Sequence, residues 1–346
     1  MKRFQNGAMI RISTFCIICG LICGGFLAFA NFVCGNPGAP TPSTVVSPQP
    51  PSETQELPTV YLTTDISPAG LAAMYQAVGR KLTGKVAVKL STGEPGGHYY
   101  LSPNLIKDLV KSVNGTIVEC NTAYGGKRIS TELHKQVARD HGFTAIAPVD
   151  IMDEEGSISL PVPNGKNIKE DFVGSHLTKY DSMLVLSHFK GHEMGGFGGA
   201  IKNISIGIAS ASGKKWIHTA GVSKTDFFLA FRTPQDAFLE SMAEAAGAVM
   251  KKLGNNIVYI NVMNNLSIDC DCNSYPAPPE LGDIGILASL DPVALDQASV
   301  DRIYLADPKA SKSLRERIEL KNGLHTLEHA VALGFGSRKY RLVVIK

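Results

Sequence analysis

The residues best suited to chemistry lie between Ser187 and Asn203, in a segment that reads SHFKGHEMGGFGGAIKN. Its two histidines can bind a metal ion or move a proton, and its two lysines can bind an anion. Five glycines in nine residues let the backbone approach a ligand and turn N–H groups toward it. The candidates here are His192, Lys190 and Lys202 for catalysis, Gly198, Gly199 and Asn203 for ligand binding, and His188 for a metal. The segment predicts a pocket for an anion or a carboxylate, because a merely flexible loop needs neither the histidines nor the lysines.

Known motifs do not explain this segment. Gly196-x-Gly198 lacks the third glycine of a dinucleotide-binding fingerprint, and His192-Glu193 lacks the second histidine of a zinc-protease helix. Residues 207–215 have the wrong spacing for a phosphate-binding loop, and the nucleophile elbow Gly-x-Ser-x-Gly does not occur. The sequence therefore matches none of these common enzyme motifs.

Two further glycine-rich loops follow predicted strands. Residues 91–98 (STGEPGGH) and residues 121–128 (NTAYGGKR) combine glycines with a histidine or a basic pair. Loops at the carboxyl ends of parallel strands meet at one edge of a sheet, where ligands bind. His98 and Lys127 therefore join the ligand-binding candidates, although each loop alone also fits an ordinary turn between a strand and a helix.

Several other polar residues have two interpretations. His218 either closes the pocket from another direction or faces solvent, and Asp296 either faces the pocket or pairs with Arg302. We count both as ligand-binding candidates. His325 and His329 have the i,i+4 spacing that can hold a metal ion, but capping or packing explains an isolated pair better.

The cysteines divide between an N-terminal group and the remaining chain. Four of the seven belong to the N-terminal segment: Cys16, Cys19, Cys23 and Cys34. The other three, Cys120, Cys270 and Cys272, are too few for a disulfide framework or for the four thiolates of an ordinary iron–sulfur cluster. Cys270-Asp271-Cys272 fits a pair of metal ligands, an i,i+2 disulfide or two packed thiols. We take Cys270 and Cys272 as candidate metal ligands, which the flanking acids Asp269 and Asp271 favour.

Short β-branched runs alternate with helical patterns along the chain. The predicted strands are 85–90, 116–120, 144–150, 182–187, 256–262, 283–289 and 340–345. Most are apolar throughout, as expected for strands covered on both faces. The predicted helices are 102–113, 130–141, 233–253, 291–303 and 324–333, and Asp291 is the expected N-cap of the fourth. This alternation predicts an α/β sandwich with a largely parallel sheet flanked by helices.

The N-terminus differs in composition from the rest. Residues 13–33 carry no charge, follow Lys2, Arg3 and Arg11, and contain the small-x-small triplet 28–30. This pattern predicts that residues 1–34 are a signal peptide, cleaved after Ala30, or a membrane anchor. Seven prolines make residues 35–58 an extended linker, and residues 59–346 form a single α/β domain. The domain is then exported, as a secreted or membrane-anchored protein.

Composition excludes several other classes of protein. Of 346 residues 19% are charged and 44% hydrophobic, with a net charge of +3, which excludes a disordered chain. From residue 59 onward 31 basic residues face 29 acidic ones, so nucleic-acid binding is not expected. Oligomeric state cannot be derived from these residues.

Specific blocks of the sequence resemble a known family. Lys190-Gly-His192, Gly198-Gly199-x-x-Lys202-Asn203, His218, Cys270-Asp-Cys272 and the stretch DIGILASLDPVALD at 283–296 resemble the uncharacterised Fe–S centre proteins, domain of unknown function 362. The resemblance covers about residues 84–346. It implies an iron–sulfur cluster by name only, since relatives carry Cys-x-x-Cys runs that this chain lacks after residue 23.

Together these observations predict a metal- or redox-dependent enzyme that acts on a small anionic substrate. The alternative is a binding protein that captures a small anion or a metal complex and catalyses nothing. Both hypotheses require that His192, Lys202 and the sulfurs of Cys270 and Cys272 lie at one cavity.

Overall fold

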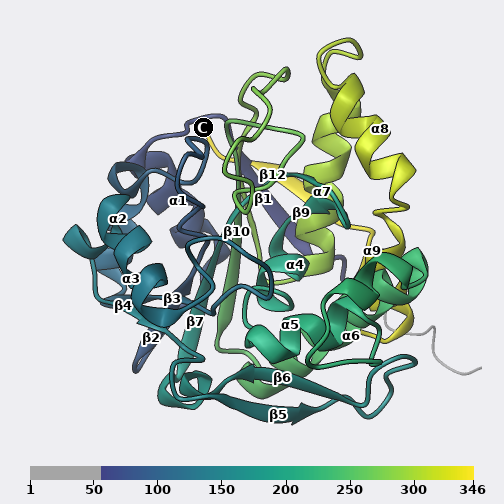
Figure 1. The fold of residues 1–346 in the computed structure, drawn as a ribbon. Helices are drawn as coiled ribbons and strands as arrows, with labels where there is room; N and C mark the ends of the chain where they lie inside the picture. The colour runs from purple at the N-terminus through teal and green to yellow at the C-terminus, as the bar shows by residue number, and fades with distance from the viewer. Residues whose placement is uncertain (1–55) are drawn as a thin grey trace, which may run out of the picture. The chain divides into compact units, whose positions relative to one another are not determined.

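The computed structural model describes residues 56–346, which belong to one compact unit. Its centre is an eight-stranded sheet with the order β12-β1-β11-β10-β7-β2-β3-β4 (Figure 1). The strands are β1 (Thr59–Thr63), β2 (Val86–Lys89), β3 (Gly115–Glu119), β4 (Val149–Ile151), β7 (Ser182–His188), β10 (Ile257–Met263), β11 (Gly285–Ser289) and β12 (Arg341–Val344). β11 pairs antiparallel with β1 and β10, and the other neighbours pair in parallel. The predicted α/β fold with a largely parallel sheet is confirmed.

Helices cover both faces of the sheet. On one face lie α1 (Pro68–Val78), α2 (Pro103–Ser112) and α3 (Thr131–Asp140), to the left in Figure 1. On the other lie α4 (Ala200–Ile204), α5 (Ala211–His218), α6 (Gln235–Leu253), α7 (Pro292–Leu305), α8 (Lys312–Leu320) and α9 (His325–Ala332). Each layer encloses its own hydrophobic core. In β7, Leu184 and Leu186 enter one core, while Met183 and Val185 enter the other. The strand is apolar throughout because both of its faces are buried.

Two small hairpins lie outside the main sheet. β5 (Ser157–Pro161) pairs with β6 (Glu170–Gly174), and β8 (Lys190–His192) pairs with β9 (Gly196–Gly198). The second hairpin is the glycine-rich segment of the sequence. It follows β7 directly and leads into α4, so it carries its polar side chains to the carboxyl end of the central strands.

Some predicted elements differ from the structure. The run 144–150 was predicted as one strand, but it forms the end of a 3-10 helix, Phe143–Ala145, and the start of β4. Gly142 takes a left-handed conformation (φ 82°) there and turns the chain sharply after α3. The strands β1, β5, β6, β8 and β9 and the helices α1, α4, α5 and α8 were not predicted. The expected N-cap at Asp291 is confirmed, because its side chain accepts hydrogen bonds from the N–H groups of Val293 and Ala294.

The prediction of a membrane-spanning helix is corrected. Across residues 56–346 we find no helix with the length and apolar character needed to cross a bilayer. The segment on which that prediction rested, residues 1–34, lies outside the described residues, as does most of the predicted linker.

Candidate functional site

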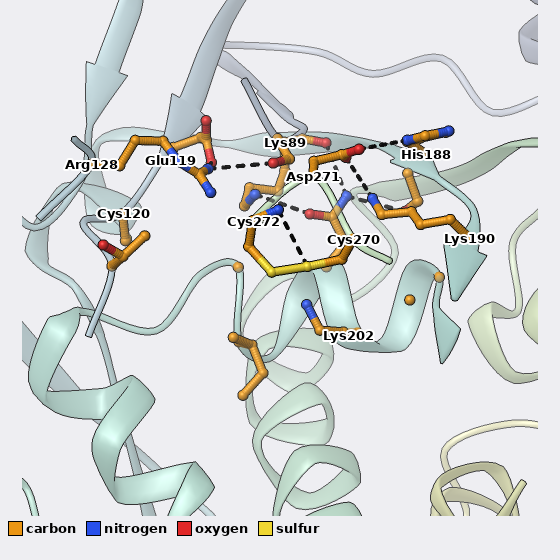
Figure 2. Close-up of a pocket in the computed structure, with 18 of the residues that line it drawn as sticks. Lys89, Glu119, Cys120, Arg128, His188, Lys190, Lys202, Cys270, Asp271 and Cys272 are labelled. Atoms are coloured by element: carbon orange, nitrogen blue, oxygen red, sulfur yellow. Dashed lines mark hydrogen bonds and ion pairs between the residues drawn. A yellow bond between two sulfur atoms is a disulfide. The ribbon is translucent and has the colours of Figure 1, made fainter. Parts of the chain in front are cut away.

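The strands β2, β3 and β7 end at a common cavity of about 90 Å³. Their last residues, Lys89, Glu119 and His188, all line it, as Figure 2 shows. Other walls come from the β8–β9 hairpin, from α4 and from the loop after β10. Parallel strands place their carboxyl ends at one edge, so segments distant in sequence meet here. The volume suits a ligand of a few non-hydrogen atoms, because pockets for larger ligands measure about 300 Å³ or more.

Lys202 offers the cavity a cation without a partner. It lies on α4, is partly exposed, and its amine makes no hydrogen bond or ion pair within residues 56–346. Removal from bulk water and the charges of Lys190 and Lys89 lower the pKa of Lys202 to about 7. Near neutral pH the amine is therefore divided between an anion-binding ammonium and a free base.

The other cations of the cavity already have partners. Arg128 is bound to Glu94 (2.9 Å) and Glu119 (3.2 Å), and Lys190 to Asp271 (2.6 Å). Although burial alone would raise the pKa of Asp271, Lys190 and a neighbouring histidine hold it below its usual range. Arg128 and its two carboxylates together carry one negative charge, and the Lys190–Asp271 pair is neutral.

Two further lysines donate to neutral oxygens instead. Lys89 bonds to the carbonyl of Leu90 and to Oδ1 of Asn203 (3.0 Å), while Lys214 bonds to the carbonyls of Ala209 and Cys120. Burial lowers the pKa of Lys89 to about 8. When Lys202 and these two lysines are protonated, the cavity has a net positive charge, which suits an anion.

The Cys270-Asp271-Cys272 loop forms another wall. Of the three arrangements open from the sequence, the structure shows the disulfide between Cys270 and Cys272. The N–H of Cys272 also donates to Sγ of Cys270 (3.2 Å). Figure 2 shows the amine of Lys202 directed toward these sulfurs, from the opposite wall of the same cavity.

Close backbone contacts hold this loop against its neighbours. The N–H of Gly191 donates to the carbonyl of Ser267 (2.9 Å), and a Cβ at Gly191 would lie 2.2 Å from the carbonyl oxygen of Ile268. The N–H of Glu94 donates to the carbonyl of Asp271 (2.9 Å). Only glycine at position 191 permits the hairpin to approach this closely.

His192 approaches the same sulfurs from β8. One of its ring nitrogens and the sulfurs of Cys270 and Cys272 all lie within 4.8 Å of one another. The N–H groups of Gly195 (2.9 Å) and Met194 (3.3 Å) donate to its Nδ1. The neutral ring then carries its proton on Nε2. Burial, then the charges of Lys202 and other cations, hold the pKa of His192 well below its usual value.

Other predicted residues serve as supports around the cavity. Asp296 does not line it. Its carboxylate accepts from the N–H groups of Ala200 (2.7 Å) and Ile201 (2.9 Å) and so anchors the start of α4. Gly199 lies directly beside Asp296, since a Cβ there would be 2.3 Å from Oδ1. Asn203 donates to the carbonyls of Lys89 and Leu186 and so ties β2 to β7.

Two predicted histidines point their nitrogens at protein oxygens. Nδ1 of His188 contacts Oδ1 of Asp271 (2.8 Å), and its Nε2 contacts the carbonyl of Asn264 (2.7 Å). Because both nitrogens face acceptors, the metal-ligand assignment of His188 is corrected: it orients Asp271. His218 donates from Nδ1 to the carbonyl of Lys214 (2.6 Å) and stacks on Phe238. Burial lowers the pKa of His218 to about 4.

Two predicted residues lie outside the cavity. His98 and Lys127 are exposed, and neither side chain lines it. In the second loop the neighbouring Arg128 is the buried residue, because Glu94 and Glu119 bind its guanidinium. His325 and His329 pair with Glu240 (3.2 Å) and Glu244 (3.1 Å) of α6, which is a packing contact between helices.

The sequence of residues 86–301 matches the family model described as Domain of unknown function (DUF362). The chain belongs to this family. No curated protein matches the DUF362 chain significantly. Among solved structures, the lactate racemase apoprotein from Thermoanaerobacterium thermosaccharolyticum is 13% identical with a TM-score of 0.42, and the match covers 72% of this chain and 57% of that one. A Thermotoga maritima protein is 13% identical with a TM-score of 0.39, covering 74% and 58%. The DUF362 chain thus spans less than two thirds of either structure, and likeness this distant carries no functional argument.

The iron–sulfur cluster that the family resemblance implied does not fit the described part of this DUF362 chain. An ordinary cluster needs four thiolates. Residues 56–346 contain three cysteines, of which two form the disulfide. The third, Cys120, is buried with its Sγ directed at the carbonyl of Ile208, and burial raises the pKa of its thiol to about 12. The structure therefore assigns no step to a cluster.

Several cavity residues were missed in the sequence. Lys89, Glu119, Cys120, Arg128, Lys214 and Asp271 all line the cavity but were not among the candidates. A lysine and a glutamate at the ends of otherwise apolar strands are the available signal, because buried charges need a partner or a ligand.

Proposed function

We propose that this DUF362 protein is a redox enzyme that acts on a small anionic substrate, with Cys270 and Cys272 as its redox couple. The observation that carries the proposal is the position of the Cys270–Cys272 disulfide and the unpartnered amine of Lys202 on facing walls of one small cavity. A structural disulfide needs no cationic cavity beside it.

The anionic substrate class follows from the balance of charge. Arg128 and Lys190 form ion pairs with three carboxylates, whereas Lys89, Lys202 and Lys214 form none within residues 56–346. When protonated, these three lysines outweigh the one excess carboxylate, so the cavity keeps a net positive charge. Holding these lysines protonated around a small volume is unfavourable, and a negative ligand bound among them would offset that cost. A carboxylate of the substrate would accept hydrogen bonds from Lys202, which is free to donate.

The redox role follows from the surroundings of the sulfurs. Reduction of the disulfide takes up two electrons and two protons from the substrate and gives two thiols, and oxidation reverses this. A nearby cation or N–H donor stabilises a thiolate and so favours the reduced form. Lys202 supplies the cation, and the N–H of Cys272 supplies a donor to Sγ of Cys270. A ring nitrogen of His192 lies within 4.8 Å of both sulfurs.

Two measurements on the full chain test this function. Isothermal titration calorimetry with propionate and with inorganic phosphate should detect binding that Lys202→Met abolishes. Lys127→Met, which removes an exposed lysine outside the cavity, is the matched control and should bind normally. Equilibration in glutathione buffers should give a reduction potential above about −300 mV, whereas structural disulfides lie below that value. Anion binding combined with a potential below it would indicate a binding protein that catalyses nothing.

A metal-dependent enzyme is the second candidate. A ring nitrogen of His192 and both sulfurs lie within 4.8 Å of one another, which is a possible three-ligand set. The set does not fit a metal ion in the state shown, because both sulfurs are in the disulfide and Nε2 of His192 carries a proton. Reduction would have to free the thiolates first. Elemental analysis of protein purified under reducing, anaerobic conditions decides: one bound metal ion that is lost in Cys270→Ser and Cys272→Ser would favour this candidate.

Export remains a prediction from the N-terminal sequence. A disulfide in the folded domain is consistent with it, since exported proteins meet oxidising conditions.

A further inference from the structure

The two sulfurs of the disulfide differ in their surroundings. Cys270 is buried, with 6% of its surface exposed, and its Sγ accepts the hydrogen bond from the N–H of Cys272. Both cysteines line the cavity, and Cys272 is the more exposed of the two. Cys272 is therefore the more accessible cysteine for a small molecule, and Cys270 is the one whose sulfur receives a backbone hydrogen bond.

This asymmetry sets the direction of thiol–disulfide exchange. A thiolate attacks the accessible sulfur of a disulfide, and the other sulfur departs faster when its thiolate is more stable. The backbone donor to Cys270 stabilises that sulfur as a leaving group. A ring nitrogen of His192 lies within 4.8 Å of both sulfurs and so does not distinguish them. Attack at Cys272 with departure of Cys270 satisfies both conditions.

Building on the proposed function, we propose that the substrate is a small thiol that carries a carboxylate, and that it reduces the disulfide by attack on Cys272. The thiolate sulfur forms a bond to Sγ of Cys272, and the Cys270–Cys272 bond breaks to leave Cys270 as a thiolate. A second molecule of the same thiol then attacks the substrate sulfur, releases the substrate disulfide and leaves Cys272 as a thiolate. The two protons lost by the thiols finish on the two cysteines, so two thiols and one protein disulfide give one small disulfide and two cysteine thiols.

The cavity explains why this thiol should carry a carboxylate. Lys202 faces the disulfide across the cavity, so it can hold a carboxylate while the thiolate reaches Cys272. A volume of about 90 Å³ admits a molecule with a few non-hydrogen atoms between the two walls. A neutral thiol of the same size would lack the contact with Lys202, and a cationic thiol would be repelled by it.

The experiment compares three small thiols that differ in charge. The oxidised full chain is mixed under anaerobic conditions with thioglycolate, 2-mercaptoethanol or cysteamine, and the reaction is quenched with N-ethylmaleimide. Peptide mass spectrometry then locates the adducts, and rate constants are compared per thiolate. We expect thioglycolate on Cys272 and maleimide on Cys270. Thioglycolate should react about fivefold faster than 2-mercaptoethanol, as expected for one charge contact at about 4 Å that water screens, and cysteamine should react slowest.

Variants separate the roles of charge and of sulfur. Lys202→Met should remove the preference for thioglycolate, whereas Lys127→Met should retain it. Cys270→Ser, treated with the disulfide of thioglycolate, should accumulate a stable adduct on Cys272, because no second sulfur can displace it.

The outcomes also separate this inference from the proposed function. Adducts on Cys270, or equal rates for the three thiols, overturn the inference. If propionate nevertheless binds to the wild-type chain and not to Lys202→Met, the anion site of the proposed function stands. If propionate also fails to bind, the proposed function fails as well.

Discussion

The sharpest consequence for stability concerns the substitution Lys202→Met, which keeps most of the side-chain volume and removes the amine. The pKa of this lysine falls from 10.5 in the unfolded chain to about 7 in the folded one. Burial is the largest cause, and Lys190 and Lys89 add to it, while Asp271 opposes them. The folded protein therefore holds the ammonium less favourably than the unfolded chain does.

The sign and size of the effect follow from proton linkage. Between pH 7 and pH 10.5 the unfolded chain binds one proton more at this site, so this lysine makes wild-type stability rise with pH. At 1.36 kcal/mol per pKa unit, protonated Lys202 lowers the free energy of unfolding at pH 6 by at most about 5 kcal/mol. Since Lys202 is partly exposed to the cavity, water reduces this destabilisation. We therefore expect Lys202→Met to be more stable than wild type by about 2–3 kcal/mol at pH 6. The stability advantage of Lys202→Met over wild type should decline through pH 9 and vanish above pH 10.5.

Urea unfolding of the oxidised full chain from pH 6 to pH 10 measures this difference. Lys127→Met, at an exposed position, is the control and should change stability little at any pH. A Lys202→Met gain that does not vary with pH, or a loss at pH 6, would refute the reasoning.

Three further substitutions test buried polar groups and close contacts in the fold. Asp171 in β6 is buried without a side-chain partner among the described residues, and burial raises its pKa to about 8. Asp171→Asn should therefore be more stable than wild type by about 2–4 kcal/mol at pH 9 and equally stable below pH 4. Urea unfolding at several pH values measures this difference. Asp296→Ala leaves the N–H groups at the start of α4 unpaired, so its free energy of unfolding should fall by about 2–4 kcal/mol, as scanning calorimetry would measure. Titration calorimetry should also find weaker propionate binding. Gly199→Ala places a Cβ 2.3 Å from Oδ1 of Asp296, so the free energy of unfolding should fall by about 1–3 kcal/mol, as thermal unfolding would measure.

The central strands could be predicted from sequence because burial on both faces leaves an apolar run. This holds for β7 and β10, which lie in the middle of the sheet with helices on either side. β1 was missed because TVYLT is short and follows directly after the proline-rich segment. The hairpins β5–β6 and β8–β9 were missed because they form outside the main sheet and carry polar or glycine residues.

The convergence of the site could be predicted from the rule that ligands bind at the carboxyl ends of parallel strands. That rule directed attention to the segment with Lys190 and Lys202, which line one cavity with Cys270 and Cys272, whereas His192 is not among the residues that line it. It did not choose between Lys127 and Arg128, which are adjacent basic residues with the same local pattern. Tertiary contacts with two distant glutamates bury the arginine and leave the lysine in solvent, and no local signal reports such contacts.

The central claim is that Lys202 acts on the Cys270–Cys272 couple across the cavity, and the reduction potential of that couple tests it most directly. Wild type, Lys202→Met and Lys127→Met would be equilibrated in glutathione buffers at pH 6.5, where much of the Lys202 amine is protonated. Loss of a cation that stabilises the reduced sulfurs should lower the potential of Lys202→Met by about 30 mV, equivalent to about 1.4 kcal/mol, and leave Lys127→Met unchanged. Equal potentials in all three proteins would contradict the account.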